Sequence, residues 1–219
     1  MKLYLPSAIA FALFVHGSAF EQIPSINYNA RKGLDSDPDS VKCKTWEEVY
    51  NDLVALQGDF TDNLRINSLV DCNQGDPVLQ YATGIGAKLD LGISTSNGHD
   101  YFLQEKTKLG EFIDKGFIDD RVASLHIGNS AIAHGLVNVD TAISYLKDIR
   151  EFIRGRGINA SVTIADSIDV YNANPQLIDA VDFVSVNYFS FWEKADVNEG
   201  VAVTLDRLKS LRIAAANKG

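Results

Sequence analysis

Two side chains that can hydrogen-bond a ligand stand next to each other at the end of a largely apolar run. The run is Val122–Ile127, Gly128 ends it, and Asn129 and Ser130 then provide an amide and a hydroxyl. Its length, apolar character and closing glycine predict a buried strand. In a parallel α/β barrel, functional groups lie at the carboxyl ends of the strands. The alternative for Asn129 is a local role, in which its side chain caps the following turn.

The other candidate ligands do not suggest a metal site. His99, His126 and His134 are scattered along the chain without ligand spacing, and two thiols alone are too few. No GxGxxG pattern opens a helix, and there is no phosphate loop. We therefore predict neither a metal nor a cofactor. Cys43 and Cys72 are the only cysteines, and such a pair in an oxidising compartment is typical of one disulfide.

Strand-like and helix-like segments alternate along the chain and must position these side chains. Short loops between them indicate parallel βα units. The predicted strands are Ser25–Ala30, Asn63–Leu69, Lys88–Ser94, Val122–Gly128, Ser161–Ala165 and Val181–Phe189. The predicted helices follow Thr45 and Asp76 and then cover Tyr101–Lys115, Val139–Ile153, Pro175–Ala180 and Val201–Ala216. We predict an α/β fold, a (β/α)8-type TIM barrel truncated to about six βα units, since about 250 residues are typical of the closed barrel.

Two helix starts carry recognisable capping signals. Thr45 is followed three residues later by Glu48, the arrangement of a capping box. Asp76 directly precedes Pro77, which predicts an aspartate cap with proline at the first helical position.

The first residues differ from the rest of the chain and predict secretion. Lys2 is followed by an apolar stretch, Leu3–Val15, and by small residues up to Ala19. This pattern indicates a signal peptide over residues 1–19, ahead of one domain over residues 20–219. A membrane helix is the alternative, but the stretch is too short to span a bilayer of about 30 Å. Asn159 begins a glycosylation sequon, Asn159–Ser161.

The charge balance excludes some partners. The net charge is -9 and the isoelectric point is about 4.8, so nucleic acid and anionic membranes are not expected to bind. A neutral polymer such as a polysaccharide remains compatible with this surface.

Several sequence segments of the mature chain resemble glycoside hydrolase family 17, the endo-1,3-β-glucanases, especially the secreted fungal and oomycete forms. They run in one order through most of the domain. They are Ile26–Gly33, Asp37–Cys43, Leu69–Gly75, Ile127–Asn129, Val162–Asp166, Asn174–Asn187, Phe189–Glu193 and Thr204–Arg212. The resemblance implies an eight-stranded βα barrel that hydrolyses β-1,3-glucan with retention, by a glutamic acid and a glutamate nucleophile at the tips of strands four and seven.

Both catalytic glutamates of that family are in doubt here. The family's acid follows an asparagine, whereas Ser130 occupies that position after Asn129. A hydroxyl is not acidic enough to protonate a leaving oxygen near pH 7. The nucleophile belongs to a strand after a helix like Val201–Ala216, and we expect it to be missing because the sequence ends at Gly219. The unclosed barrel would expose the edges of its first and sixth strands.

The resemblance also suggests which residues contact the sugar. Asn129 would hold a sugar hydroxyl, Tyr28 and Tyr188 would lie near the cleft floor, and Phe191 and Trp192 would stack on glucan rings. Each residue has a structural alternative: the tyrosines as packing at the rim of the core, and the aromatic residues as a cover for the end of the barrel.

Three hypotheses about the function follow from this resemblance. The leading hypothesis is a secreted, cell-wall-associated glucanase homologue that is inactive or severely impaired, because Ser130 occupies the acid position and the nucleophile strand is expected to be missing. The second is a non-catalytic β-glucan binder, or a decoy that engages a protein partner. The third is a fragment of an active glucanase.

Overall fold

The computed structural model describes residues 24–57, 63–192 and 194–218. The predicted signal peptide lies outside these residues. In the described part of the chain, no helix combines the length and the apolar character needed to cross a membrane.

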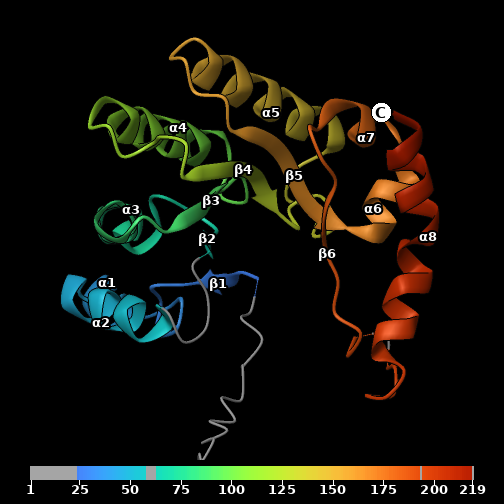
Figure 1. The fold of residues 1–219 in the computed structure, drawn as a ribbon, viewed down its shortest axis with the longest axis horizontal. Coiled ribbons are helices and arrows are strands. Elements are labelled where there is room, and N and C mark those ends of the chain that lie inside the picture. Colours follow the sequence, from blue (N-terminus) through green and yellow to red (C-terminus); the bar gives the residue numbers. More distant parts are fainter. Residues whose placement is uncertain (1–23, 58–62, 193, 219) are drawn as a thin grey trace, which may run out of the picture.

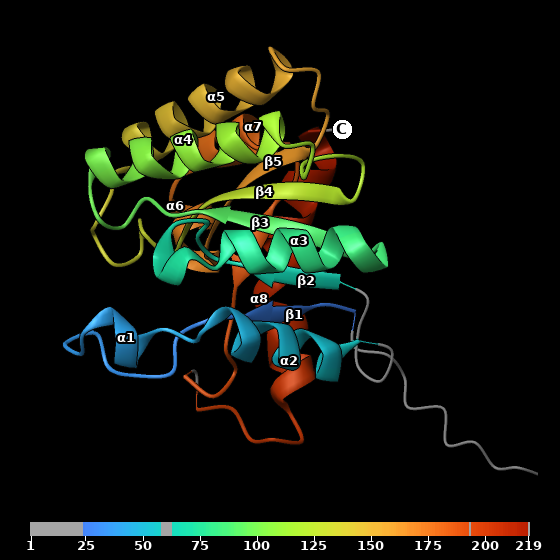
Figure 2. The ribbon, with the colours of Figure 1, turned by 90° about the vertical axis from the view of Figure 1, so that its left-hand side faces the viewer.

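Six parallel strands form one sheet in which each strand pairs with its neighbours in sequence, from β1 to β6. Figure 1 shows the sheet curled into a half-barrel, and Figure 2 shows the helices along its outer side. The prediction of an incomplete βα barrel is confirmed. The strands are β1 (Ile26–Tyr28), β2 (Asn63–Ile66), β3 (Lys88–Ile93), β4 (Val122–Asn129), β5 (Ser161–Ser167) and β6 (Ser185–Asn187).

Helices connect the strands and cover the convex face of the sheet (Figure 1). The two long crossover helices α4 and α5 lie over the middle strands, and α8 packs against α6 and α7. The helices are α1 (Asp39–Lys42), α2 (Trp46–Leu56), the 3₁₀ turn η1 (Asp71–Asn73), α3 (Gly75–Ile85), α4 (His99–Asp114), α5 (Val139–Arg154), α6 (Ile168–Ala173), α7 (Gln176–Ala180) and α8 (Gly200–Lys218).

The two predicted helix starts had different outcomes. The capping box at α2 is confirmed: Glu48 N donates to Thr45 Oγ1 at 3.2 Å, and Thr45 N donates to Glu48 Oε2 at 2.7 Å. The aspartate cap is wrong, because Gln74 is the cap of α3 and Asp76 lies within its first turn. The carboxylate of Asp76 instead forms an ion pair with Lys108 Nζ of α4, 2.8 Å away. A contact between two helices thus replaced the local cap.

The sixth predicted strand is also shorter than expected, and α6 was not predicted at all. Before β6, the carboxylate of Asp182 accepts from Val162 N at 2.8 Å and from Arg150 Nη2 at 2.8 Å. The Asp182 side chain therefore occupies the Val162 N–H, which a backbone carbonyl of the neighbouring strand would otherwise have used. Regular pairing between β5 and β6 begins only at Ser185. The helix α6 begins because the hydroxyl of Ser167 accepts from Val170 N at 3.2 Å.

A buried carboxyl group shortens the second strand in a similar way. Glu105 of α4 is fully buried and accepts hydrogen bonds from the hydroxyl of Ser68 and, at 2.8 Å, from Leu69 N. These bonds turn the chain out of β2 after Ile66. Burial raises the pKa of the Glu105 carboxyl to about 7, although the hydrogen bonds to it act in the opposite direction.

The core lies between the sheet and the helices. Alternate residues of the four central strands point to this side and are almost completely buried, as expected for strands with one face under helices. They are Leu64, Ile66, Leu89, Leu91, Leu125, Ile127, Val162 and Ile164. The opposite, concave face carries the polar side chains of the same strands.

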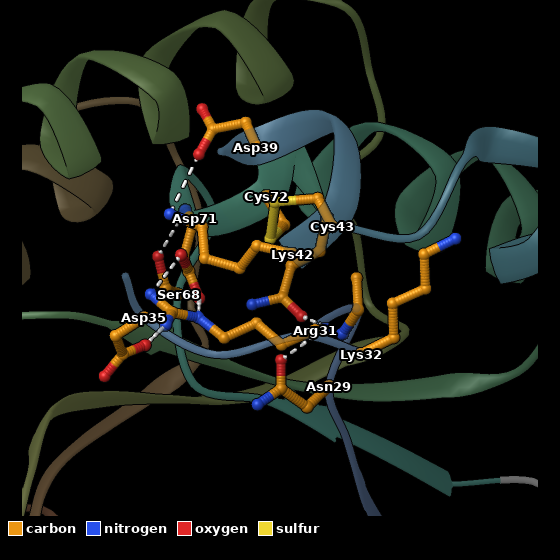
Figure 3. Close-up of a disulfide and its surroundings, with 12 residues drawn as sticks. Asn29, Arg31, Lys32, Asp35, Asp39, Lys42, Cys43, Ser68, Asp71 and Cys72 are labelled. Atoms are coloured by element: carbon orange, nitrogen blue, oxygen red, sulfur yellow. Dashed lines mark hydrogen bonds and ion pairs between the residues drawn. A yellow bond between two sulfur atoms is a disulfide. The ribbon is translucent and has the colours of Figure 1, made fainter. Parts of the chain in front are cut away.

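The predicted disulfide is present and joins the two loops that follow β1 and β2. Cys43 and Cys72 have their Cα atoms 5.2 Å apart and are separated by 29 positions in sequence. Figure 3 shows Arg31 beside the bridge, where its guanidinium donates to both carboxylate oxygens of Asp71, at 2.6 and 2.8 Å. Covalent and ionic links thus hold the same pair of loops together.

Replacing both cysteines with serine should lower the free energy of unfolding by roughly 3 to 4 kcal/mol, because the bridge restricts a loop of this length in the unfolded chain. Urea unfolding of the wild-type protein and of the double variant, each with and without reductant, measures this difference. Reductant should shift the wild-type midpoint and leave the variant unchanged. An identical wild-type midpoint under both conditions would contradict the prediction.

Candidate functional site

Three polar side chains meet at the carboxyl ends of β4 and β6. The side-chain amide nitrogen of Asn187 donates to Asn129 Oδ1 at 2.8 Å and to Ser130 Oγ at 2.8 Å. Asn129 is exposed, whereas Asn187 and Ser130 are half-buried. The two residues singled out in the sequence therefore lie at the predicted end of the strand. They share one hydrogen-bonding partner that local sequence did not reveal.

The backbone around Ser130 is fixed by the next strand. Ser130 has a φ of 56°, which is unusual for a residue other than glycine, and its N–H donates to Ala165 O at 2.8 Å. The fully buried carboxylate of Asp166 accepts from Ile132 N at 2.9 Å, from Ala133 N at 3.2 Å and from Ser167 N at 2.8 Å. Asp166 thus holds the turn that follows Ser130.

Gly128 makes the close approach at this tip possible. Its φ is 80°, and a Cβ atom at this position would lie 2.8 Å from Thr95 Oγ1 of the neighbouring loop. A larger residue would force the Thr95 side chain or the backbone to move, in addition to the strain of the positive φ. The glycine that ends the apolar run therefore has a steric reason as well as a conformational one.

A chain of hydrogen bonds crosses the concave face below the tip. Ser124 Oγ donates to the carboxylate of Asp90 and lies 2.9 Å from His126 Nε2. Since its one proton is directed to Asp90, Ser124 must accept from His126 Nε2. A neutral His126 then accepts at Nδ1 from Ser185 Oγ, 3.2 Å away. The chain links β3, β4 and β6.

Charge on this face favours the neutral imidazole. Burial, followed by the positive charge of Arg65, lowers the pKa of His126 to about 3. Burial also lowers the pKa of Arg65, and the negative charge of Asp90 offsets part of that effect. Phe183 approaches the imidazole edge-on, with ring centroids 5.7 Å apart. At neutral pH, His126 therefore connects hydroxyl groups and carries no charge.

The structure does not bring all the predicted sugar-binding residues together. Tyr28 is buried on the helix side of β1, where its hydroxyl donates to Asp52 Oδ2 of α2 at 2.9 Å. Burial, followed by the hydrogen bond to Asp52, raises the pKa of the Tyr28 hydroxyl well above its usual value. These contacts agree with the structural alternative for Tyr28, in which the tyrosine packs at the rim of the core. Lys44 lies over its ring, 5.2 Å from the centroid.

The other predicted aromatic residues follow β6 directly. The hydroxyl oxygen of Tyr188 is buried, and no described residue hydrogen-bonds to it. Phe191 and Trp192 are 80% and 75% exposed and meet edge-on, with centroids 5.6 Å apart. Two large aromatic faces are thus available to a ligand a few residues beyond Asn187.

Asn187 is the site residue that the sequence analysis did not single out. It was only part of a longer matching phrase, Asn174–Asn187. The available signal was the alternation of Ser185 and Asn187, two polar residues that share the concave face at the end of a strand. Its contact with Ser130 could not be predicted, because it depends on how sharply the sheet curls across β5.

Two further predictions are placed but not tested by the structure. Asn159 is exposed in the loop before β5, where a glycan could be attached. Across the described ranges, no group of three or more histidine, cysteine, aspartate and glutamate side chains is arranged to hold a metal ion.

Comparison with known proteins gives consistent results. A model described as the BtgE/BtgC glycoside hydrolase domain matches residues 25–219. A probable family 17 glucosidase, SCW10 of Saccharomyces cerevisiae, is 27% identical over 172 residues, which are 74% of this chain and 41% of that protein. A glucan 1,3-beta-glucosidase of the same yeast is 23% identical over 96% of this chain and 68% of its own length.

Solved structures of a fungal protein share the fold. One of them is an active-site mutant of the Rhizomucor miehei beta-1,3-glucanosyltransferase in complex with laminaritriose, with a TM-score of 0.74 at 22% identity. The similarity covers 89% of this chain and 68% of that chain. The chain spans less than half of the SCW10 protein and about two thirds of the glucanosyltransferase.

The low pKa of His126 predicts how stability depends on acidity. The unfolded chain takes up a proton at this histidine near pH 6.5, whereas the folded chain does so only near pH 3. Stability should therefore fall as the pH is lowered from 6.5 towards 3. Replacing His126 with glutamine should remove this part of the loss. Urea midpoints of both proteins across this range test the prediction, and parallel curves would contradict it.

Proposed function

Because this chain belongs to the BtgE/BtgC glycoside hydrolase family and is similar to family 17 proteins of fungi, we propose that it is a secreted β-1,3-glucan-binding protein. In this proposal the protein hydrolyses that polymer very poorly or not at all. The relatives named as glucosidases and the glucanosyltransferase bound to laminaritriose support β-1,3-glucan as the ligand. The fungal cell wall is the proposed place of action.

The observation that carries this proposal is the chemistry of Ser130. The tip of β4 presents a hydroxyl whose side-chain partner is the amide of Asn187, not a carboxylic acid. Protonation of a leaving oxygen requires a group with a pKa near the working pH, and an alkyl hydroxyl is far from that range. A missing general acid typically removes a factor of about 10² to 10⁴ in rate.

The carboxylate of Asp166, which holds the turn after Ser130, is not suited to replace the acid. Asp166 is fully buried and accepts three backbone hydrogen bonds, from residues 132, 133 and 167. These three bonds occupy the carboxylate oxygens and hold them away from solvent. Asp166 is therefore assigned a positioning role for Asn129 and Ser130.

Features suited to holding a neutral sugar remain at the same end of the sheet. The amides of Asn129 and Asn187 offer donors and acceptors without a charge, which matches sugar hydroxyl groups. Phe191 and Trp192 expose faces on which the C–H groups of a glucose ring can stack. This combination supports retained binding alongside lost chemistry.

The wild-type protein should not measurably hydrolyse laminarin, and Ser130→Ala should behave in the same way. Reducing-sugar release, measured beside an active family 17 glucanase, tests both proteins. Turnover near that of the active enzyme that disappears in Ser130→Ala would overturn the proposal of impaired catalysis.

The protein should nevertheless bind insoluble β-1,3-glucan. The double variant Phe191→Ala/Trp192→Ala should lose most of the bound fraction, because both stacking faces are removed. Leu34→Ala is a matched control, since Leu34 is another large side chain that is 71% exposed, in the loop between β1 and α1. A pull-down that retains wild-type protein no better than an unrelated secreted protein would refute glucan binding.

A further inference from the structure

A second group of aromatic side chains lies on the outer side of the half-barrel, between α2 and α3. These two helices pack against each other, as both views of the ribbon show (Figures 1 and 2). The groove between them contains a hollow of about 370 Å³, within the range of known ligand sites. It is lined by Trp46, Tyr50, Gln80, Tyr81, Gly84 and Ile85.

Two of the three aromatic side chains of the hollow are exposed, whereas the third, Tyr81, is buried. Trp46 and Tyr50 are 51% and 42% exposed, and their rings are nearly parallel, with an interplanar angle of 11° and centroids 5.5 Å apart. Tyr81 meets Tyr50 edge-on at 5.5 Å. Trp46 and Tyr50 therefore stack on each other, and the parts of both rings that stay exposed are available to a ligand, while Tyr81 supports Tyr50 from the side.

Hydrogen bonds fix this arrangement before any ligand arrives. Trp46 is the first residue of α2, and the capping box of Thr45 and Glu48 sets the start of that helix. On the other side, the hydroxyl of Tyr81 donates to Gln57 Oε1 at 2.8 Å, beyond the end of α2. A preformed site loses little conformational entropy on binding, which favours affinity from modest contacts.

The lining also indicates what kind of molecule fits. All six lining residues are uncharged, and Gln80 provides a donor and an acceptor. Two other hollows on this acidic protein include charged side chains, Asp119 and Asp120 in one and Asp140, Lys147, Asp148 and Glu151 in the other. A neutral molecule with flat C–H faces and hydroxyl groups at its edge matches the aromatic hollow. Saccharide rings have this chemistry.

Space for such a ring exists above Gly84. A Cβ atom placed on this residue would have no neighbour within 4 Å. Gly84 lies inside α3 with ordinary helical geometry, where glycine is about 1 kcal/mol less favourable than alanine. The open space can therefore be filled by substitution without forcing the backbone.

We propose that the Trp46–Tyr50–Tyr81 hollow is a second saccharide-binding site that takes a neutral β-glucan segment. The proposal rests on glucan being the ligand of this protein. The hollow lies on the helix side of the sheet, whereas Asn129 and Ser130 lie at the strand tips. Two sites on one domain would raise the effective affinity for a long polymer, provided that one chain can reach both.

The two tryptophans of the chain allow the sites to be tested separately. Trp46 belongs to the hollow and Trp192 to the strand-tip region, and the sequence has no other tryptophan. Trp192→Phe leaves Trp46 as the single fluorescent reporter, and Trp46→Phe leaves Trp192. Titration of each variant with laminarihexaose should give a saturable change in fluorescence for both reporters. Adding Tyr50→Ala to the Trp192→Phe background should weaken the Trp46 response by about tenfold, the effect of 1.4 kcal/mol in binding free energy.

Substitutions at Gly84 provide a matched control. Gly84→Leu fills the hollow and should abolish the Trp46 response, whereas Gly84→Ala should preserve it. Circular dichroism and urea midpoints identify any variant that fails to fold.

The two proposals fail in different ways. A silent Trp46 beside a responding Trp192 would overturn the second site alone. A Trp46 response unchanged by both Tyr50→Ala and Gly84→Leu would also overturn it. Silence of both reporters, together with no retention on insoluble glucan, would refute the proposed function.

Discussion

Burial of one apolar face of a parallel sheet is the constraint on which this structure depends. Parallel neighbours can be joined only by crossovers, so a helix follows almost every strand and lies on the convex side. Residues such as Leu91, Leu125 and Val162 are buried between the sheet and the helices. The concave face then carries the polar half of each strand, including Asp90, Ser124 and His126. Placement of polar groups at the strand tips is a direct result of this division.

Pattern and capping chemistry predicted most of the fold, because they are local. Thr45 and Glu48 are three residues apart, so the start of α2 could be recognised from the sequence. Asp76 shows the opposite case, since its partner Lys108 comes from another helix and no local rule predicts that competition. The bounds of β2 and β6 were misjudged because side-chain carboxylates took backbone donors: the buried Glu105 of α4 binds Leu69 N, and Asp182, just before β6, binds Val162 N of β5.

For the site as well, local features could be predicted from the sequence and contacts between distant segments could not. Asn129 and Ser130 follow a strand directly, and that position alone brings them to the tip. The role of Asn187 arises from curvature, which brings β6 back towards β4 across the concave side. Tyr28 shows how much depends on the face of a strand that a side chain occupies. A single step along a strand changes which face a side chain occupies, and here the ring lies under α2.

The left-handed backbone at Ser130 has a consequence for how such a domain evolves. The conformation is held by Ala165 and by the carboxylate of Asp166, both from β5, and the side chain at position 130 contributes only its bond to Asn187. The fold at this tip therefore depends on Ala165 and Asp166, whereas the residue type at position 130 is restricted mainly by the positive φ. Substitutions at position 130 that tolerate this backbone should leave the domain folded, so the side chain at the tip of β4 can change while the scaffold is kept.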